Sequence, residues 1–304
     1  MTEAATPEVD PGTLADAVRD FITAAGGRGV DAMDLRIEED GDVPTITGRV
    51  LTYRQERGVL ELARTHGAGT RLAVVADPAS GLEQGWVEPV VEVLDTWREP
   101  SRAGEEMGRQ DQYLAADGPL RRLGADGDFV LVQGVDLALG WAAAGDVRDT
   151  DAGAARSAWA GVERATAPVA RPVALDGAGT ADLLRRARAE IGVPYVWGGT
   201  THAGFDCSGL LLRAFHDVTG VLLPRHTGDQ RRVGARVVAG DARAGDLLFA
   251  RPRQQKVGHV CLMTSPATVL HACRTEHEVI EEGLEENARR YLHQGWRRPV
   301  LLSA

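Results

Sequence analysis

The sequence is poor in cysteine, in lysine and in long apolar runs. Of its 304 residues only three are cysteines and one is a lysine, Lys256, so arginine carries nearly all the positive charge. A small, odd number of cysteines argues against a disulfide framework and indicates a reducing compartment. No run is apolar enough to span a bilayer, and residues 1–18 lack the basic and apolar regions of a signal peptide. We therefore expect a cytoplasmic protein, or an extracellular one if the natural start is missing.

Basic residues are also fewer than acidic residues. There are 44 acidic and 34 basic residues, which gives a formal net charge of −10 and a pI of about 5.3. Such a surface repels phosphates unless its basic residues are concentrated in one patch, so we expect no nucleic-acid partner and no anionic membrane partner. The sequence has neither a glycine-rich phosphate loop nor the spacing of a zinc site. We expect no cofactor and no metal.

The most informative stretch, GVPYVWGGTTHAGFDCSG, runs from Gly192 to Gly209. The residues that follow, 210–220, have the apolar spacing of an amphipathic helix and end in a glycine. Cys207 therefore lies in the first turn of a helix, with Asp206 as its N-cap. Unpaired backbone N–H groups and the positive end of the helix dipole favour a thiolate there, and a thiolate is nucleophilic. The other interpretation is a buried, inert cysteine.

Two histidines downstream can supply a base. His259 lies in the apolar run VGHVCLM, and His271 lies in the next one, TVLHACR. Two consecutive antiparallel strands can bring these residues side by side, so that His259 faces the thiol and His271 orients its imidazole. This gives the nucleophile, base and orienting residue of a papain-like triad. Cys261 and Cys273, in the same two runs, are expected to be buried packing residues.

Together these residues resemble the NlpC-type cell-wall cysteine peptidases, over about residues 180–304. The shared motifs occur in this order: PYVWGG (Pro194–Gly199), FDCSGL (Phe205–Leu210), LPRHTGDQ (Leu223–Gln230), AGDLLFAR (Ala244–Arg251), GHV (Gly258–Val260) and the later His271. The resemblance implies a papain-like α+β fold and hydrolysis of amide bonds in murein stem peptides, between γ-D-glutamate and a diamino acid. It also implies a nucleophile at Cys207, a base at His259 and an orienting residue at His271.

The resemblance assigns roles to further residues. Tyr195 takes the position whose hydroxyl assists the oxyanion hole, beside the backbone N–H of Cys207. Where the family commonly has Ser or Thr after Pro-Arg, this chain has His226 followed by Thr227, which leaves that polar contact open. His202, in the glycine-rich loop, either lines the cleft or, as we expect, lies in solvent. The residues expected to bind substrate are Asp206, Ser208, Trp197, Arg225 and Thr227.

Two further units precede the peptidase segment. The pattern α-β-β-α-β over residues 1–80 predicts a small α+β module that resembles a BON module; a spacer or oligomerisation domain is the other interpretation. Short strands with Gly and Asp between them over residues 81–148 predict a β-barrel that resembles a bacterial SH3-like domain. Residues 149–176 are rich in Ala, Gly and Pro, which is typical of a linker, with room for a short helix. Residues 177–304 hold the peptidase.

The predicted barrel supplies candidates for packing and for recognition. A carboxylate near the cleft can bind the free amine of a peptide. An endopeptidase with this contact would cleave its substrate at a fixed distance from the free N-terminus. The candidates for this contact are Tyr113, Glu83 and Glu88. The tryptophans of the same segment are expected to pack in the core or between domains: Trp86, Trp97 and Trp141.

The predicted function is hydrolysis of γ-D-glutamyl-diamino acid bonds in murein-derived peptides, through a thioester acyl-enzyme. A cytoplasmic member of the family would trim peptides already released from the wall. One alternative is a cysteine amidase or acyltransferase of the same fold that acts on a non-murein amide or ester. Another is a catalytically silent scaffold, against which the intact Cys207, His259 and His271 argue. The sequence indicates no particular oligomeric state.

Overall fold

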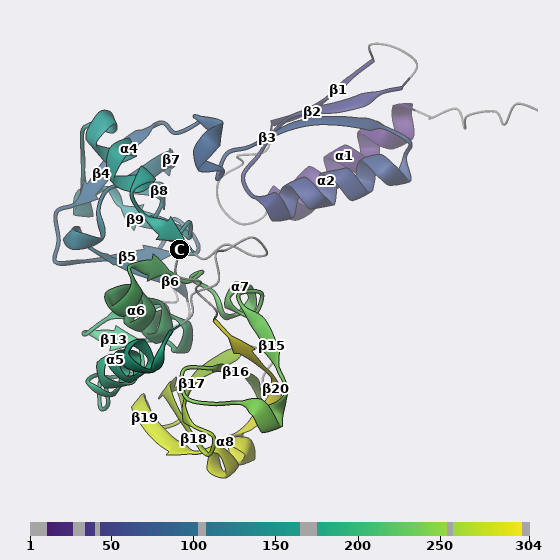
Figure 1. Ribbon diagram of the computed structural model, residues 1–304. Helices are drawn as coiled ribbons and strands as arrows, with labels where there is room; N and C mark the ends of the chain where they lie inside the picture. The colour runs from purple at the N-terminus through teal and green to yellow at the C-terminus, as the bar shows by residue number, and fades with distance from the viewer. Residues whose placement is uncertain are drawn as a thin grey trace, which may run out of the picture.

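The computed structural model describes residues 11–26, 34–39, 43–102, 108–164, 175–253 and 258–299. Three larger sheets follow one another along these parts of the chain, with three, seven and six strands (Figure 1). No helix in the described parts is both long enough and apolar enough to cross a bilayer. The chain is thus a mixed α+β protein, as the sequence predicts.

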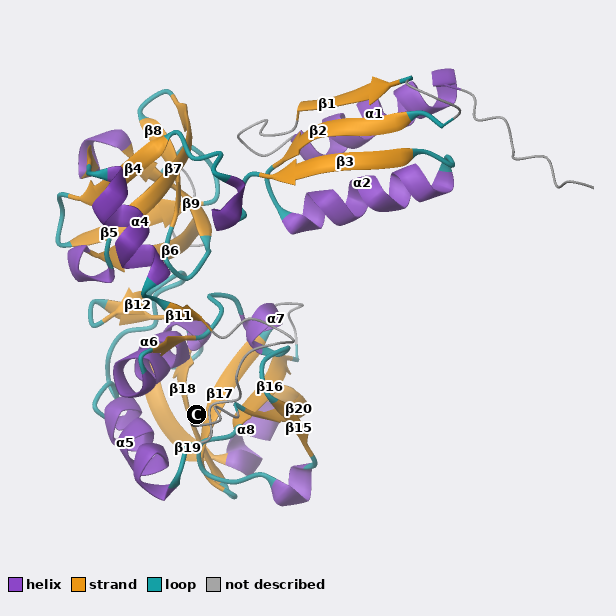
Figure 2. Cartoon of the chain, turned by 45° about the horizontal axis from the view of Figure 1, so that its top comes forward, coloured by secondary structure: helices purple, strands orange, loops and turns teal. Residues whose placement is uncertain are grey.

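The N-terminal sheet carries two helices on one face (Figure 2). Strand β1 is antiparallel to β2, and β2 is parallel to β3. Apolar side chains from both helices and from β2 and β3 form its core. The order is the α-β-β-α-β expected; the likeness to a BON module stays a prediction. The elements are α1 (Pro11–Gly26), β1 (Asp34–Glu38), β2 (Thr45–Val50), α2 (Tyr53–Thr65) and β3 (Gly69–Val74).

The seven-stranded sheet, here called the middle sheet, runs from β4 to β10 in the order β10-β4-β7-β8-β9-β5-β6. Every pairing in it is antiparallel. Trp86, Trp97 and Trp141 are buried, as expected for packing residues. The likeness to an SH3-like domain stays a prediction. The strands are β4 (Gly85–Pro89), β5 (Val93–Trp97), β6 (Arg109–Leu114), β7 (Leu120–Asp126), β8 (Phe129–Gln133), β9 (Leu139–Ala143) and β10 (Val147–Asp149).

The first part of the predicted linker is packed structure. Helix α4 (Ala152–Ala160) begins at the N-cap Asp151, whose side chain accepts a hydrogen bond from the helix backbone. Its Trp159 packs edge-on against Trp86 of β4, with ring centroids 5.3 Å apart. Strand β11 (Glu163–Arg164) then pairs with a strand of the peptidase segment. Helix α4 is thus anchored to the middle sheet, while residues 165–174 of the predicted linker lie outside the described residues.

The C-terminal part packs helices α5 and α6 against a six-stranded sheet of order β15-β20-β16-β17-β18-β19 (Figure 1). Helix α6 is buried along most of its length, because the sheet, α5 and the middle sheet surround it. The elements are α5 (Gly177–Arg188), β12 (Thr200–Thr201), β13 (Gly204–Phe205), α6 (Cys207–Thr219), β14 (Val221–Leu222), α7 (Thr227–Gln230), β15 (Ala235–Val237), β16 (Leu247–Pro252), β17 (His259–Ser265), β18 (Thr268–Cys273), β19 (Glu278–Gly283), α8 (Leu284–Arg290) and β20 (Tyr291–Arg298).

Close packing at the start of α6 gives a first prediction. A Cβ added at Gly209 would lie 2.0 Å from the carbonyl oxygen of Gly199, so Gly209→Ala must push the helix away from the preceding loop. We expect a loss of about 1–3 kcal/mol in the free energy of unfolding, measured with urea. The control is Gly177→Ala in α5, where an added Cβ meets nothing within 4 Å. Equal stability of the two variants would contradict this account of the packing.

Candidate active site

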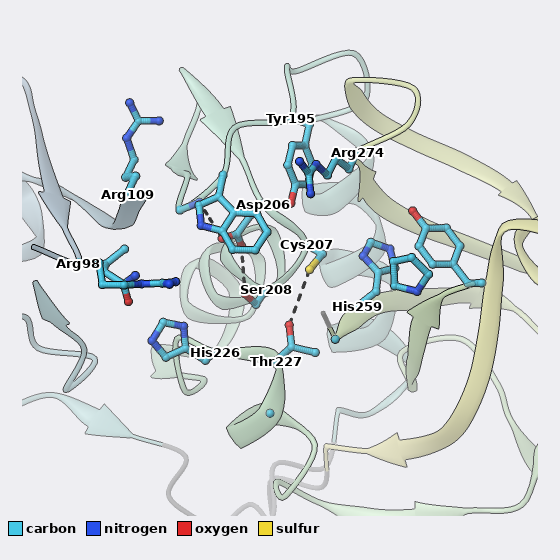
Figure 3. A pocket seen from close by; sticks show the side chains of 17 residues that line it. Arg98, Arg109, Tyr195, Asp206, Cys207, Ser208, His226, Thr227, His259 and Arg274 are labelled. Carbon is cyan, nitrogen blue, oxygen red and sulfur yellow. Dashed lines mark hydrogen bonds between the residues drawn. The ribbon is translucent and has the colours of Figure 1, made fainter. Parts of the chain in front are cut away.

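The nucleophile is placed by the cap of α6. The Asp206 side chain accepts a hydrogen bond from the backbone N–H of Gly209 at 2.7 Å, which starts the helix at Cys207. The thiol sulfur lies 3.7 Å from Oγ1 of Thr227 at the start of α7. Cys207 is only 7% exposed, yet it lines a pocket of about 300 Å³ (Figure 3). The predicted helix start and N-cap are therefore present.

The two histidines meet on neighbouring antiparallel strands. His259 is the first residue of β17, and His271 lies on β18. Nε2 of His259 is 2.8 Å from Nδ1 of His271, and both rings are buried. Figure 3 shows the imidazole of His259 beside the sulfur of Cys207, on the wall of the same pocket. The structure thus brings together the three residues expected to form the triad.

A buried carboxylate extends this arrangement. Nε2 of His271 lies 2.9 Å from Oε1 of Glu282, which also accepts a hydrogen bond from Asn287 at 2.8 Å. Arg290 donates to the other carboxylate oxygen of Glu282 at 2.7 Å. Although burial opposes ionisation, the hydrogen bonds from His271 and Asn287 hold the pKa of Glu282 below its ordinary value. The sequence analysis missed Glu282, but the adjacent pair Glu281-Glu282 on a strand must place one acid on each face.

These contacts fix the tautomers of both histidines. An ionised Glu282 can only accept, so Nε2 of His271 carries a proton and Nδ1 of the neutral ring is an acceptor. His259 then donates from Nε2 to His271, which leaves its Nδ1 unprotonated. The Tyr291 ring stacks on His259 at a centroid distance of 4.3 Å and an angle of 10°, which holds the imidazole plane. The free nitrogen of His259 is therefore the one available to take the proton of Cys207.

The surroundings of Cys207 act against the thiolate that its helix start favours. Burial, followed by the charge of Asp206, raises the pKa of Cys207 to about 11, against the opposing effect of a hydrogen bond with the backbone of Val260. Burial holds the pKa of His259 well below its ordinary value, and a positive charge on His271 would lower it further. The helix start alone favours a thiolate, but burial opposes it, and the carboxylate that caps α6 adds a negative charge beside the sulfur. Both pKa shifts favour a thiol and a neutral imidazole in the free site.

Most of the predicted site residues line the pocket. Tyr195, Trp197, Asp206, Ser208 and Thr227 all line it, together with His226. Arg225 does not: its side chain is buried behind Asp206 and donates to that carboxylate at 2.8 Å. The prediction that these residues contact substrate stays a prediction, and for Arg225 the contact can only be indirect in this arrangement.

Arginines from two sheets also line the pocket. The middle sheet supplies Arg98 and Arg109, and Arg274 follows β18, with its guanidinium carbon 5.8 Å from the Trp197 ring centroid. Among the described residues that line the pocket Asp206 is the only acid, and Arg225 pairs with it. The pocket wall is therefore rich in positive charge. The sequence analysis missed these arginines, because nothing local marks which loop of the middle sheet reaches Cys207.

The candidates for binding a free amine are placed elsewhere. Glu83 pairs with Arg121 and Arg156, Glu88 pairs with Arg148, and Tyr113 is buried in the middle sheet. None of the three lines the pocket, so their assignment to amine recognition is wrong. The two acids already pair with arginines, and the Tyr113 hydroxyl already bonds to Asp136. The side chain of His202 is 71% exposed, in agreement with a solvated loop histidine.

One group of potential metal ligands includes the two histidines of the site. Ligand atoms of His259, Cys261 and His271 lie within 4.8 Å of one another, and all three residues are buried. The two rings bond to each other, His271 also bonds to Glu282, and the Cys261 sulfur accepts a weak hydrogen bond from Asn287. The hydrogen bonds of the triad account for this cluster. Cys261 and Cys273 are both fully buried, as expected for packing residues.

Comparison with known proteins agrees with this geometry. The sequence model of the NlpC/P60 family matches residues 192–298. A γ-D-glutamyl-L-lysine dipeptidyl-peptidase of Bacillus subtilis (strain 168) is 39% identical over 100 residues, which is 32% of this chain and 33% of that protein. The peptidoglycan endopeptidase RipB of Mycobacterium tuberculosis (strain CDC 1551 / Oshkosh) is 40% identical over 103 residues, 30% of this chain and 42% of that protein. The chain thus spans well under two thirds of either relative.

A solved structure is also similar to part of this chain. The NlpC/p60 domain of the peptidoglycan hydrolase SagA is 30% identical, and the match covers 39% of this chain and 97% of that one, with a TM-score of 0.35. The matches to these three proteins each involve 30–39% of the chain. The similarity they report therefore concerns about a third of the chain.

The His259–His271–Glu282 chain gives a kinetic prediction. Glu282→Gln keeps an acceptor for His271 but removes the charge that stabilises a protonated His259, so kcat should fall by about 10- to 100-fold with KM little changed. His271→Ala should likewise lower kcat more than it raises KM. The matched control is Glu281→Gln, the adjacent acid, which pairs with Arg188. Equal kinetics for the Glu281 and Glu282 variants would contradict the assigned role.

The protonation state of the nucleophile can be measured directly. The difference in thiolate absorbance between the wild-type protein and Cys207→Ala, followed against pH, isolates the titration of Cys207 from that of the other two cysteines. We expect a midpoint near the pKa of about 11 that burial imposes, and in any case above the ordinary value for cysteine. A midpoint below pH 7 would show a preformed thiolate–imidazolium pair instead.

Proposed function

Because residues 192–298 match the sequence model of the NlpC/P60 family, we propose that this chain is a cysteine peptidase. Its substrates would be murein-derived peptides, cleaved between γ-D-glutamate and a diamino acid. The observation that carries the proposal is the meeting of Cys207 and His259 in one pocket, with His259 held by His271 and Glu282. The names of the two relatives, a γ-D-glutamyl-L-lysine dipeptidyl-peptidase and a peptidoglycan endopeptidase, support the choice of substrate.

The proposed reaction begins from the neutral pair. The thiol of Cys207 passes its proton to Nδ1 of His259 while the sulfur attacks the scissile carbonyl carbon. The protonated imidazole is stabilised by the carboxylate of Glu282 through His271. It then gives the proton to the departing amine, which leaves a thioester on Cys207. Water, deprotonated by the same Nδ1, hydrolyses the thioester and restores the thiol.

Tyr195 is suited to stabilise the tetrahedral intermediate. Its side chain lines the pocket near Cys207, and burial raises its pKa well above the ordinary value. The phenol therefore stays protonated and can donate a hydrogen bond to a developing oxyanion, together with the backbone N–H of Cys207. Both donors are fixed before the substrate binds, Tyr195 by the loop that precedes Asp206 and Cys207 by α6.

The charge of the pocket matches such a substrate. A γ-linked glutamate leaves its α-carboxylate free beside the scissile bond, and the diamino acid adds at least one charged group. Guanidinium groups bind carboxylates with two parallel hydrogen bonds, and Arg98 and Arg274 both line the pocket (Figure 3). An acidic peptide is therefore favoured over a basic one.

The test is hydrolysis of L-Ala-γ-D-Glu-diaminopimelate, followed by chromatography and mass spectrometry. We expect cleavage of the γ-glutamyl bond by the wild-type protein and no turnover by Cys207→Ala, because the acyl-enzyme cannot form. The α-linked isomer of the peptide is the matched control. Its free carboxylate is the side-chain carboxylate, which has a different position relative to the scissile bond and to the arginines, so it should be cleaved at least about tenfold more slowly. Full activity of Cys207→Ala would refute the mechanism.

Two further arms separate the alternatives. Intact sacculi test whether the enzyme prefers wall-bound peptides to released ones. A panel of small esters and non-murein amides tests the interpretation of a same-fold amidase or acyltransferase. If the protein turns over that panel but does not cleave the γ-glutamyl peptide, it is a same-fold amidase or acyltransferase and not a murein peptidase. Cys207 and His259 have the same roles in both classes.

A further inference from the structure

We propose that Asp111, on β6 of the middle sheet, is a positioning residue for the active site. It holds Arg225, which in turn holds Asp206 at the start of α6. The middle sheet would then be part of the catalytic unit and not only a neighbouring domain. The inference rests on the proposed function for its kinetic readout, but the contacts that carry it are independent of the substrate.

Arg225 is clamped between a carboxylate of the middle sheet and the N-cap carboxylate of α6. Its Nε donates to Oδ1 of Asp111 at 2.6 Å, and its Nη2 donates to Oδ2 of Asp206 at 2.8 Å. Nη1 donates to Oδ1 of Asp206 at 3.2 Å and to Oγ of Ser208 at 3.1 Å. The side chains of Arg225 and Asp111 are 2% and 1% exposed. A charge this deeply buried is held by its partners, so loss of the Asp111 charge would remove one of the two carboxylates that hold Arg225 and should shift its guanidinium.

Asp206 transmits this constraint to the pocket. Its two oxygens also accept from the backbone N–H of Gly209 at 2.7 Å and from that of Gly198 at 3.1 Å. One side chain thus fastens the first turn of α6 to the loop that carries Tyr195 and Trp197. Displacement of Arg225 would release Asp206 and alter the distance between the nucleophile and that loop.

Asp111 is itself fixed within the middle sheet. Its Oδ1 accepts from the backbone N–H of Gln112 at 2.8 Å, and its Oδ2 is buried without a normal hydrogen bond among the described residues. Burial and the charge of Asp111 raise the pKa of Asp136 well above its ordinary value, because the two carboxyl groups lie close together in the core. The hydroxyl of Tyr113 donates to Asp136 at 3.2 Å. The contact therefore continues into the core of the middle sheet.

The same interface contains an ion pair that does not reach the pocket. Asp117 of the middle sheet binds Arg213 of α6 through two bonds of 2.7 and 3.0 Å, and both side chains are 13% exposed. This pair joins the same two units, on the same helix as Cys207, but neither residue touches Asp206 or lines the pocket. A variant of Asp117 therefore weakens docking of the two units without disturbing Asp206.

The experiment compares Asp111→Asn with Asp117→Asn on the γ-glutamyl tripeptide. We expect kcat/KM to fall at least about tenfold for Asp111→Asn and to stay within about threefold of wild type for Asp117→Asn. A double-mutant cycle with Asp206 distinguishes a positioning role of Asp111 from a role in docking the two units only. In an Asp206→Asn background the effect of Asp111→Asn should vanish, whereas any effect of Asp117→Asn should persist.

Several outcomes would overturn the inference. Equal losses in the two single variants would reduce Asp111 to a docking residue, and so would additive effects of the Asp111 and Asp206 substitutions. If Asp111→Asn does not fold, Asp111→Glu keeps the charge and should retain more activity than Asp111→Ser. A wild-type protein inactive on the tripeptide refutes the proposed function alone. The rate of Cys207 alkylation by iodoacetamide then replaces kcat/KM in the same comparison, and an unchanged rate in Asp111→Asn overturns the inference.

Discussion

The capping of α6 by Asp206 is the contact on which the active site depends. One carboxylate satisfies the backbone at the helix start, holds the preceding loop through Gly198 and pairs with the buried Arg225. Because it must lie next to Cys207 to do so, it also places a negative charge beside the sulfur. The residue that positions the nucleophile therefore adds to the larger effect of burial in raising the pKa of Cys207.

The second half of the site compensates for this. A thiol that does not ionise by itself needs a base that is uncharged at rest and stabilised once it is protonated. Burial keeps His259 neutral, while Glu282, reached through His271, stabilises the imidazolium when it forms. The Glu282 carboxylate is thus separated from the Cys207 sulfur, but it is close enough to stabilise protonated His259 through His271. This division of charge suits general-base activation of a thiol.

Placement of the middle sheet against α6 gives the pocket its other wall. Arg98 and Arg109 reach the pocket from one side of this interface, and Asp111 reaches Arg225 beneath it. The C-terminal segment alone holds Cys207, His259 and His271, but it lacks Arg98, Arg109 and the second partner of Arg225. Substrate preference and pocket geometry are therefore properties of the two units together.

The sequence by itself determined the α+β class, the order of the elements, the helix start at Cys207 and the two strands that carry His259 and His271. Capping, strand alternation and apolar spacing are local, so neighbouring residues suffice to predict them. Only the tertiary structure decided the protonation state of Cys207, the role of Glu282 and the contact of Asp111 with Arg225. Burial and charge pairing depend on residues far apart in the chain, such as Asp111 and Arg225, and no local pattern encodes which of them meet.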